Sequence, residues 1–304
     1  MNRKLGRGWL LAVLLASVTL VAACGSSSSS ATSKGTVIVG GFNFPESSIM
    51  AYLYGKSLEH AGYTVNYRLL LGNREIVAPA LESGQIDLYP GYAATDLEYY
   101  NQAAGEATGD VTATTAKLNS HLTLLNLQAL TASSAVDQNA FAVTKDTQAK
   151  YNLTKLSDLT AIGNQLVLGA GPECPTRPFC QPGLASVYGI HFKDFKALDT
   201  DGPLTRAAFK NGSIQVGLVF SSDADLTSLG LVVLQDDKHL ENADNLVPII
   251  RNAVATPDVA AILNKVSAGL TTADLVTMNG QVELQHMDAD AVALAYLQAH
   301  NYFA

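Results

Sequence analysis

The side chains that could perform acid–base or nucleophilic chemistry fit no catalytic pattern in this chain. Its six histidines lie mostly near the ends of predicted helices and strands, beside charged or polar neighbours, as solvated surface histidines do. Gly55-Lys56-Ser57 could end a phosphate-binding P-loop, but the glycine required five positions earlier is Met50. The motifs Gly-x-Ser-x-Gly, His-Glu-x-x-His and Gly-x-Gly-x-x-Gly do not occur. The sequence therefore predicts a protein that is not an enzyme and needs no cofactor or metal.

Two cysteines are close enough in the sequence to be joined to each other. Cys174 and Cys180 enclose five residues, two of which are prolines. In an oxidising compartment such a pair forms a local disulfide, and the alternative is two free thiols. A metal site would need further His or Cys ligands at suitable spacing, and none lies nearby. We expect a disulfide that fixes the loop around Arg177.

The start of the chain resembles a bacterial lipoprotein precursor. Basic residues precede an apolar run over 9–20 that is too short to span a bilayer, and the letters VAAC at 21–24 are similar to a lipobox. The resemblance implies a signal peptide over 1–23, lipidation of Cys24, and a location on the extracytoplasmic face of the cell membrane. An ordinary secretory peptide cut nearby is the alternative. Residues 24–35, rich in Gly and Ser, are expected to form a flexible tether.

The charge balance argues against one class of partner. The chain carries 19 Lys and Arg against 27 Asp and Glu, and loss of residues 1–23 removes three basic residues, which leaves a net charge of about −11. An acidic surface repels phosphate backbones, and no cluster of Lys and Arg with interleaved aromatic residues occurs, so nucleic acid is not an expected partner. No stretch after residue 24 has 18 consecutive apolar residues, so any transmembrane function would depend on other chains.

The rest of the chain alternates between predicted strands and helices. An apolar run at 36–39 ends in two glycines, and Pro45 then begins a helix that stops at Gly62. Further strands are predicted at 63–71, 86–89 (ended by Pro90-Gly91), 141–144, 166–169, 214–220, 231–234 and 246–250. Further helices are predicted at 75–83, 111–122, 204–210, 257–268, 272–279 and 290–300. This order indicates an α/β protein with open, mostly parallel sheets that bind ligands beyond the carboxyl ends of their strands.

The length of the chain indicates two lobes. About 270 residues follow the tether, which is large for one core. Crossings of the chain near 135–139 and 234–245 predict a hinged clamshell, in which 36–138 plus 240–304 form lobe I and 139–239 form lobe II. The last three helices are expected to return to lobe I. The cleft between the lobes is the expected ligand site.

Five segments together carry a family resemblance. They are GGFNFPES at 40–47, GNREIVAPALESGQIDLYPGY at 72–92, TRPFCQPGL at 176–184, NGSIQVGLVFSSDADL at 211–226 and LVVLQDDK at 231–238. From about residue 36 to the C-terminus the chain resembles the substrate-binding lipoproteins of glycine betaine, carnitine and choline ABC importers. The resemblance implies a type II periplasmic-binding-protein fold and a small ligand of the osmoprotectant type. It also implies a permease and a cytoplasmic ATPase as partners.

The resemblance also implies site residues. In that family a box of aromatic rings holds a quaternary ammonium, because this group donates no hydrogen bonds, while Arg and polar groups hold the carboxylate of the ligand. Tyr92 and Phe220 match positions in the box. Thr95 matches a polar contact, Asp137 a carboxylate beside the box, and Arg177 the group that binds the anion. These residues also have purely structural interpretations. Tyr92 could simply end a strand, Phe220 could be a core ring, and Arg177 could be a charge in a loop.

Three positions depart from the family pattern. Asn139 and Asp244 stand where aromatic rings are usual, and Phe42 replaces a lysine that commonly precedes the pair matched by Asn43-Phe44. Loss of two ring faces, each worth about 0.5–2 kcal/mol, would weaken betaine binding by about tenfold to several hundredfold. A choline-like cation, a polyol and a hydroxylated aromatic therefore remain candidate ligands.

The function predicted from the sequence is that of a monomeric, lipid-anchored solute-binding protein that delivers a glycine betaine-like or choline-like solute to an ABC importer. A membrane-anchored enzyme on a similar bilobal scaffold is one alternative. Two observations count against it. Such an enzyme would need a cysteine for attaching a cofactor, whereas the body of this chain has only Cys174 and Cys180, and the chain begins with a predicted export signal. A sensor or adhesion module is another alternative, and such a module would not need a closing cleft.

Overall fold

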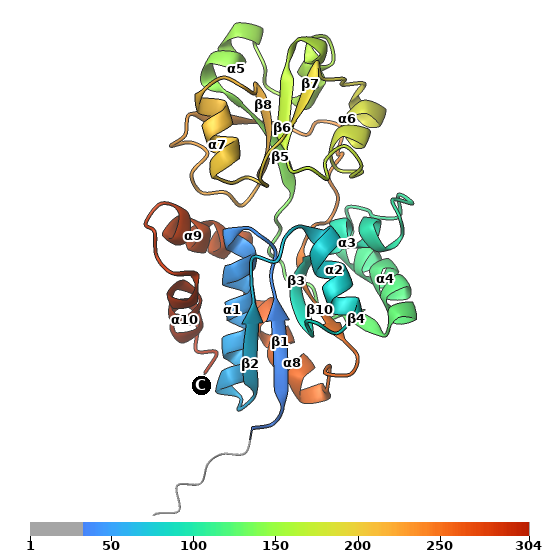
Figure 1. The fold of residues 1–304 in the computed structure, drawn as a ribbon, viewed down its shortest axis with the longest axis vertical. Helices are drawn as coiled ribbons and strands as arrows, with labels where there is room; N and C mark the ends of the chain where they lie inside the picture. Colours follow the sequence, from blue (N-terminus) through green and yellow to red (C-terminus); the bar gives the residue numbers. More distant parts are fainter. Residues whose placement is uncertain (1–32, 304) are drawn as a thin grey trace, which may run out of the picture. The chain divides into compact units, whose positions relative to one another are not determined.

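The computed structural model describes residues 33–303 and shows a two-lobed α/β architecture, as predicted (Figure 1). The predicted signal peptide, Cys24 and most of the predicted tether lie outside the described residues. The strands are β1 (Thr36–Gly40), β2 (Thr64–Arg68), β3 (Leu88–Tyr92), β4 (Leu127–Ala129), β5 (Asn139–Thr144), β6 (Val167–Ala170), β7 (Asp194–Ala197), β8 (Val216–Phe220), β9 (Leu231–Leu234) and β10 (Leu246–Arg251). The α-helices are α1 (Pro45–His60), α2 (Arg74–Glu82), α3 (Ala93–Tyr100), α4 (Val111–Leu122), α5 (Lys145–Tyr151), α6 (Gln181–Tyr188), α7 (Pro203–Lys210), α8 (Pro257–Gly269), α9 (Thr272–Glu283) and α10 (Ala289–Ala299).

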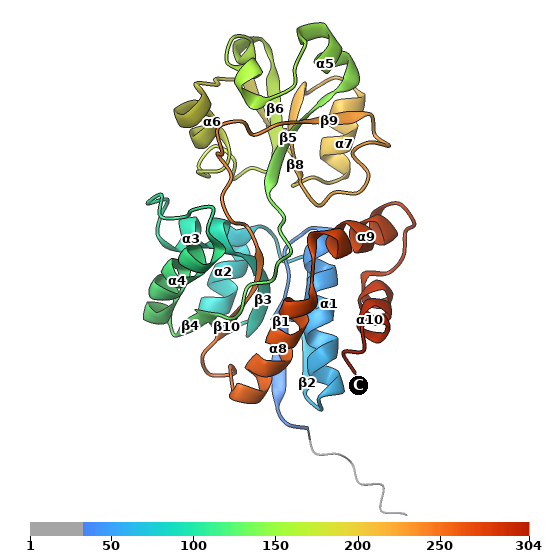
Figure 2. The same cartoon turned by 180° about the vertical axis from the view of Figure 1, so that it is seen from behind.

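Each lobe is built on one five-stranded sheet. The first sheet has the order β2-β1-β3-β10-β4, and the second has the order β7-β6-β8-β5-β9. In each sheet four strands run in the same direction and one opposes them, namely β10 in the first sheet and β5 in the second. The C-terminal helices α8, α9 and α10 all contact α1, so the end of the chain packs on the first lobe (Figures 1 and 2).

The cores follow from the pattern of apolar residues along the strands. One large cluster fills the first lobe and includes the fully buried Val39, Leu88 and Ile249. In the second lobe, consecutive residues of β5 enter different clusters, with Phe141 on one face of the sheet and Ala142 on the other. This alternation is that of a strand covered on both faces.

Two segments of the chain connect the lobes and pair with each other. Val136 and Asn245 form an isolated antiparallel bridge, and the backbone N–H of Asp137 donates to the carbonyl of Asp244 over 3.1 Å. The connection between the lobes is therefore a narrow two-stranded link, as a hinge requires. The residue boundaries predicted for the two lobes stay a prediction.

Several predicted elements were wrong in extent. β3 does not stop before Pro90-Gly91 but continues to Tyr92, because Pro90 lies opposite Pro248 of β10. Two prolines cannot exchange N–H bonds, so they form the non-hydrogen-bonded kind of pair that an antiparallel ladder contains at alternate positions. β2 ends at Arg68 rather than 71, since Leu70 has a positive φ of 54°. The sequence analysis also missed α3, α5, α6, β4 and β7.

Among residues 33–303, no single helix has the length and apolar composition needed to cross a membrane. The bent pair α8 and α9 meets these criteria of length and composition only when its two helices are counted together, and these helices are inclined by 90° to each other.

Candidate functional site

A cavity of about 300 Å³ lies between the lobes, where the loops after β1, β3, β6 and β8 meet. Open α/β sheets bind ligands at this edge, and the volume is at the lower end of the range for small-molecule sites. All nine residues that the sequence analysis assigned to a ligand line the cavity: Phe42, Asn43, Tyr92, Thr95, Asp137, Asn139, Arg177, Phe220 and Asp244. The fold thus brings together side chains that are up to about 200 positions apart in the sequence.

One wall of the cavity is a cluster of aromatic rings. The ring centroid of Phe44 lies 5.0 Å from that of Phe220, 5.7 Å from that of Phe42 and 6.2 Å from that of Tyr92. Phe42 is buried, and the guanidinium of Arg74 lies 5.0 Å from its ring centroid. Phe44 and Phe220 remain only half-buried. They are therefore the rings of this cluster most open to a ligand.

Sequence reasoning missed three aromatic residues of the cavity lining, namely Phe44, Tyr99 and Phe179. Phe44 stands beside Asn43 in a quoted motif and could have been found there. Tyr99 lies on α3, which was not predicted, and Phe179 lies between the two cysteines.

Asn139 and Asp244, the polar residues predicted to replace family rings, are engaged by the protein itself. The carboxylate of Asp244 accepts the backbone N–H of Thr95 over 2.8 Å and also the hydroxyl of Thr95. The amide of Asn139 donates to the carbonyl of Phe179 over 3.1 Å. Burial raises the pKa of Asp244 to about 6, although the hydrogen bonds from Thr95 oppose this shift. Asp244 is therefore mostly ionised at pH 7 and adds negative charge to the cavity.

A buried carboxyl pair lies behind the aromatic wall. Glu46, in the first turn of α1, accepts the hydroxyl of Tyr92 over 2.7 Å and that of Ser222 over 2.6 Å. Asp137 accepts the backbone N–H of Ser222 over 3.0 Å. Burial, together with the neighbouring charge of Glu46, raises the pKa of Asp137 well above its usual range. This network fixes the ring of Tyr92 at the cavity.

Arg177 lies in a loop closed by a disulfide between Cys174 and Cys180, whose Cα atoms are 5.2 Å apart. Gly183 lets this loop pack on the first turn of α6, since a Cβ there would collide with the carbonyl of Pro178. Arg177 does not present a free guanidinium fork: its Nε and Nη2 donate to the two carboxylate oxygens of Glu75, each over 2.9 Å.

Glu75 belongs to the first lobe and Arg177 to the second, so their pair connects the lobes across the cavity lining. Burial alone would raise the pKa of Glu75, but the hydrogen bonds and the charge of Arg177 lower it below its usual value. Nearby, Asn73 donates to Glu173 over 3.1 Å and makes a second contact between the lobes. The sequence analysis did not assign a role to Glu75 or Glu173.

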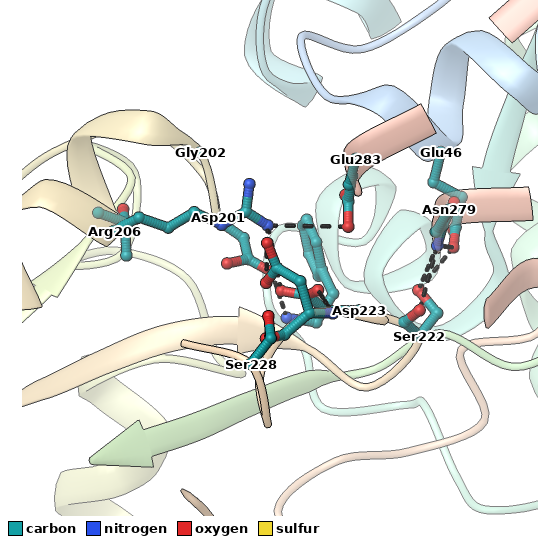
Figure 3. Close-up of polar contacts among 12 residues, drawn as sticks. Glu46, Asp201, Gly202, Arg206, Ser222, Asp223, Ser228, Asn279 and Glu283 are labelled. Carbon is teal, nitrogen blue, oxygen red and sulfur yellow. Dashed lines mark hydrogen bonds and ion pairs between the residues drawn. The ribbon is translucent and has the colours of Figure 1, made fainter. Parts of the chain in front are cut away.

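A second polar cluster connects the lobes beside the cavity (Figure 3). Arg206 of α7 lies 3.3 Å from Asp223, 3.4 Å from Asp225 and 3.7 Å from Glu283 of α9. These three carboxylates are close enough together to hold a metal ion, and the guanidinium of Arg206 places one positive charge among them. Figure 3 also shows Glu46 and Asn279 of the first lobe pointing toward Ser222 of the second, with the amide of Asn279 donating to Glu46 over 2.8 Å.

Comparison with known proteins assigns this arrangement to a family. The family of the substrate-binding domain of ABC-type glycine betaine transport systems matches residues 35–299. The chain belongs to this family. A member of an ABC-type transport system that binds the substrate does not convert it, so the protein is not an enzyme.

Individual members of the family are similar to this chain over most of their length. The glycine betaine-binding protein YehZ of Escherichia coli is 26% identical over 266 residues, which cover 83% of this chain and 87% of the relative. The carnitine transport binding protein OpuCC of Listeria monocytogenes is 26% identical over 307 residues, or 96% of this chain and 95% of the relative.

Solved structures show the same fold. A crystal structure of a glycine betaine/carnitine/choline ABC transporter matches with a TM-score of 0.68 and 23% identity, and it covers 88% of this chain and 100% of that chain. An ABC-transporter choline-binding protein in complex with choline matches with a TM-score of 0.64 and 15% identity, over 88% of this chain and 89% of that one. The two-lobed periplasmic-binding-protein fold of the family is therefore present here.

Proposed function

We propose that the protein captures a small quaternary ammonium solute between its lobes and delivers it to the permease and ATPase of an ABC importer. The observation that carries this proposal is a cavity of about 300 Å³ in which clustered aromatic rings meet an acidic wall. Ring faces attract a cation that has no N–H groups, and the charge of Asp244 adds to that attraction. The similarity to proteins named for glycine betaine and carnitine supports the same class of ligand.

Ten residues are proposed to contact or enclose this solute, the nine named from the sequence and Phe44. Phe42, Tyr92 and Phe220 would form the aromatic wall, with Phe44 added by the structure. Asp137, Asn139 and Asp244 would form the polar wall together with Thr95. Asn43 and Arg177 would lie at its edge.

A thermal-shift screen followed by calorimetry tests the proposal. Glycine betaine, carnitine and choline would be compared with a polyol, a phenol and an amino acid. A quaternary ammonium present at 100 times its dissociation constant stabilises the folded protein by about 2.7 kcal/mol, so its melting temperature should rise. Phe220→Ala should weaken binding by about 0.5–2 kcal/mol through loss of a ring face. Stabilisation by a polyol or phenol alone would contradict the proposed ligand class.

We also propose that the protein acts as a monomer that Cys24 anchors to the extracytoplasmic face of the cell membrane. The similarity of residues 21–24 to a lipobox supports the anchor. Cys24→Ala should release the protein from the membrane fraction or stop its processing. A Cys24→Ala protein that stays in the membrane and still incorporates labelled fatty acid would contradict this anchor. Light scattering of the purified protein tests the monomer.

A further inference from the structure

The cationic groups that line the cavity are already paired with acids of the protein. Arg74 and Arg177 are the two Lys or Arg residues among the described lining. Arg74 is buried, lies against Phe42 and donates to Asp96 over 2.6 Å. Arg177 donates through its Nε and Nη2 to both oxygens of Glu75. Neither guanidinium therefore offers its charge unopposed to a ligand.

Arg177 binds the carboxylate of Glu75 with the geometry that a guanidinium uses to bind the carboxylate of a ligand. Two parallel N–H···O bonds of 2.9 Å form the bidentate arrangement that a guanidinium makes with a ligand acid. A carboxylate on the ligand would have to use the remaining edge of Arg177. There it would lie beside the negative charge of Glu75, and the two like charges would repel each other.

The other acids of the lining increase this repulsion. Glu75, Glu98, Glu173 and Asp244 all line the cavity, against two arginines. A cation without an acid group is attracted to such a lining, whereas the carboxylate of a zwitterion is repelled by it.

Glu75 also makes the link between the lobes that a ligand carboxylate could otherwise make. A ligand acid bound to Arg177 would link the second lobe to a solute held in the first. Here Glu75, in the first turn of α2, makes that link itself, and the contact of Asn73 with Glu173 lies beside it. Closure of the lobes around a solute therefore does not require an acid group on the solute.

We propose that Glu75 is a specificity-determining residue, whose carboxylate occupies Arg177 in place of a ligand acid and so selects quaternary ammonium solutes that lack a carboxylate. This inference rests on the proposed function. It concerns discrimination within that ligand class, and it can fail while the class itself is correct.

Calorimetry with choline and glycine betaine tests the inference, since the two probes share a trimethylammonium and differ in the acid group. The wild-type protein should bind choline at least about tenfold more tightly, which is about 1.4 kcal/mol. Glu75→Gln should lower the ratio of the betaine to the choline dissociation constant by at least about tenfold. Glu75→Gln combined with Arg177→Gln should lose this gain in betaine binding.

Glu173→Gln is the matched control, because it removes one negative charge from the same lining without touching Arg177. It should change the ratio by less than about threefold, or less than about 0.7 kcal/mol. Glu75→Ala is a second variant, and thermal unfolding of each protein checks its fold.

An unchanged ratio in both Glu75 variants, while both probes bind, would overturn the role of Glu75 and leave the proposed function intact. So would an equal weakening of both probes, because that result would make the pair a contact for closure only. If neither probe binds any of the folded proteins, the proposed ligand class is wrong and the role of Glu75 fails with it.

Discussion

Two of the groups of polar contacts that join the lobes differ in their exposure to solvent. The inner group, beside the cavity, is centred on Glu46, which is 3% exposed and accepts bonds from Tyr92, Ser222 and Asn279. The outer pair lines the cavity, and the side chains of Glu75 and Arg177 are 40% and 18% exposed.

Because of this difference in burial, we expect the inner group to affect the stability of the protein and the outer pair to affect its choice of ligand. A buried group that loses its partner keeps the full cost of desolvation, whereas water replaces the lost partner at an exposed pair. We therefore expect the inner group to determine how stable the arrangement of the lobes is. The outer pair is expected to contribute little to stability and to act through the charge that it presents to a ligand.

The largest effect is expected from Glu46→Ala. It leaves the hydroxyls of Tyr92 and Ser222 without their acceptor, and each buried orphan costs about 1–3 kcal/mol. The amide of Asn279 loses one hydrogen bond, worth about 1 kcal/mol, and keeps its bonds to Ser222. The free energy of unfolding should fall by at least about 3 kcal/mol in urea denaturation. Ser222→Ala, which removes one of these donors, should cost only about 1 kcal/mol. A loss below about 1 kcal/mol for Glu46→Ala would remove the distinction between the inner and outer groups.

The next effect concerns pH. The pKa of Asp244 rises from 3.8 to about 6 on folding, so the folded protein binds this proton more tightly than the unfolded chain does. Its contribution to stability is complete below pH 3.8 and is lost as the pH rises to about 6. Two pKa units correspond to about 3 kcal/mol.

Asp244→Asn should remove that slope. The unfolding free energy of the wild-type protein should fall by about 2–3 kcal/mol more than that of the variant between pH 4 and about 6.5. Urea denaturation at a series of pH values measures the two curves. Parallel curves would show that Asp244 is ionised in the folded protein throughout, as a solvent-exposed acid is.

A smaller effect on stability is expected from the disulfide. Removing a bridge that closes so short a loop costs about 2 kcal/mol at most on the chain-entropy estimate. Cys174→Ser combined with Cys180→Ser should lower the melting temperature modestly and weaken ligand binding more, because the loop carries Arg177 and Phe179. Calorimetry and thermal unfolding of the double variant, beside the oxidised wild type, separate the two effects. A large loss of stability with unchanged affinity would assign the bridge to the core instead.

The smallest effect on stability is expected from Glu75→Gln. A partly exposed ion pair contributes about 0–1 kcal/mol, so the urea midpoint should hardly move. The same variant should change ligand preference, and that contrast is the sharpest test of the comparison. A loss of 2 kcal/mol or more would place the outer pair with the inner group.

Elements with strong local signals could be predicted from the sequence. Pro45 fixed the start of α1, and the bounds predicted for α4 and β9 agree with the structure. The misses have weak local signals. β7 lies at the edge of its sheet and has one half-buried residue among exposed ones, so it shows no run of apolar residues that would mark a strand. α3 follows β3 without a turn, so no loop residues marked its start.

The sequence alone determined the α/β class, because strand ends and helix starts are marked locally, and its motifs carried the family resemblance that named nine of the side chains lining the cavity. Only the tertiary structure decided how these side chains pair. Glu75 meets Arg177 from 102 positions away, and Glu46 meets Ser222 from 176 positions away. No local pattern encodes such partners, because they meet only when the two lobes come together. The tertiary structure also decided that Arg177 binds Glu75, an acid of the protein itself.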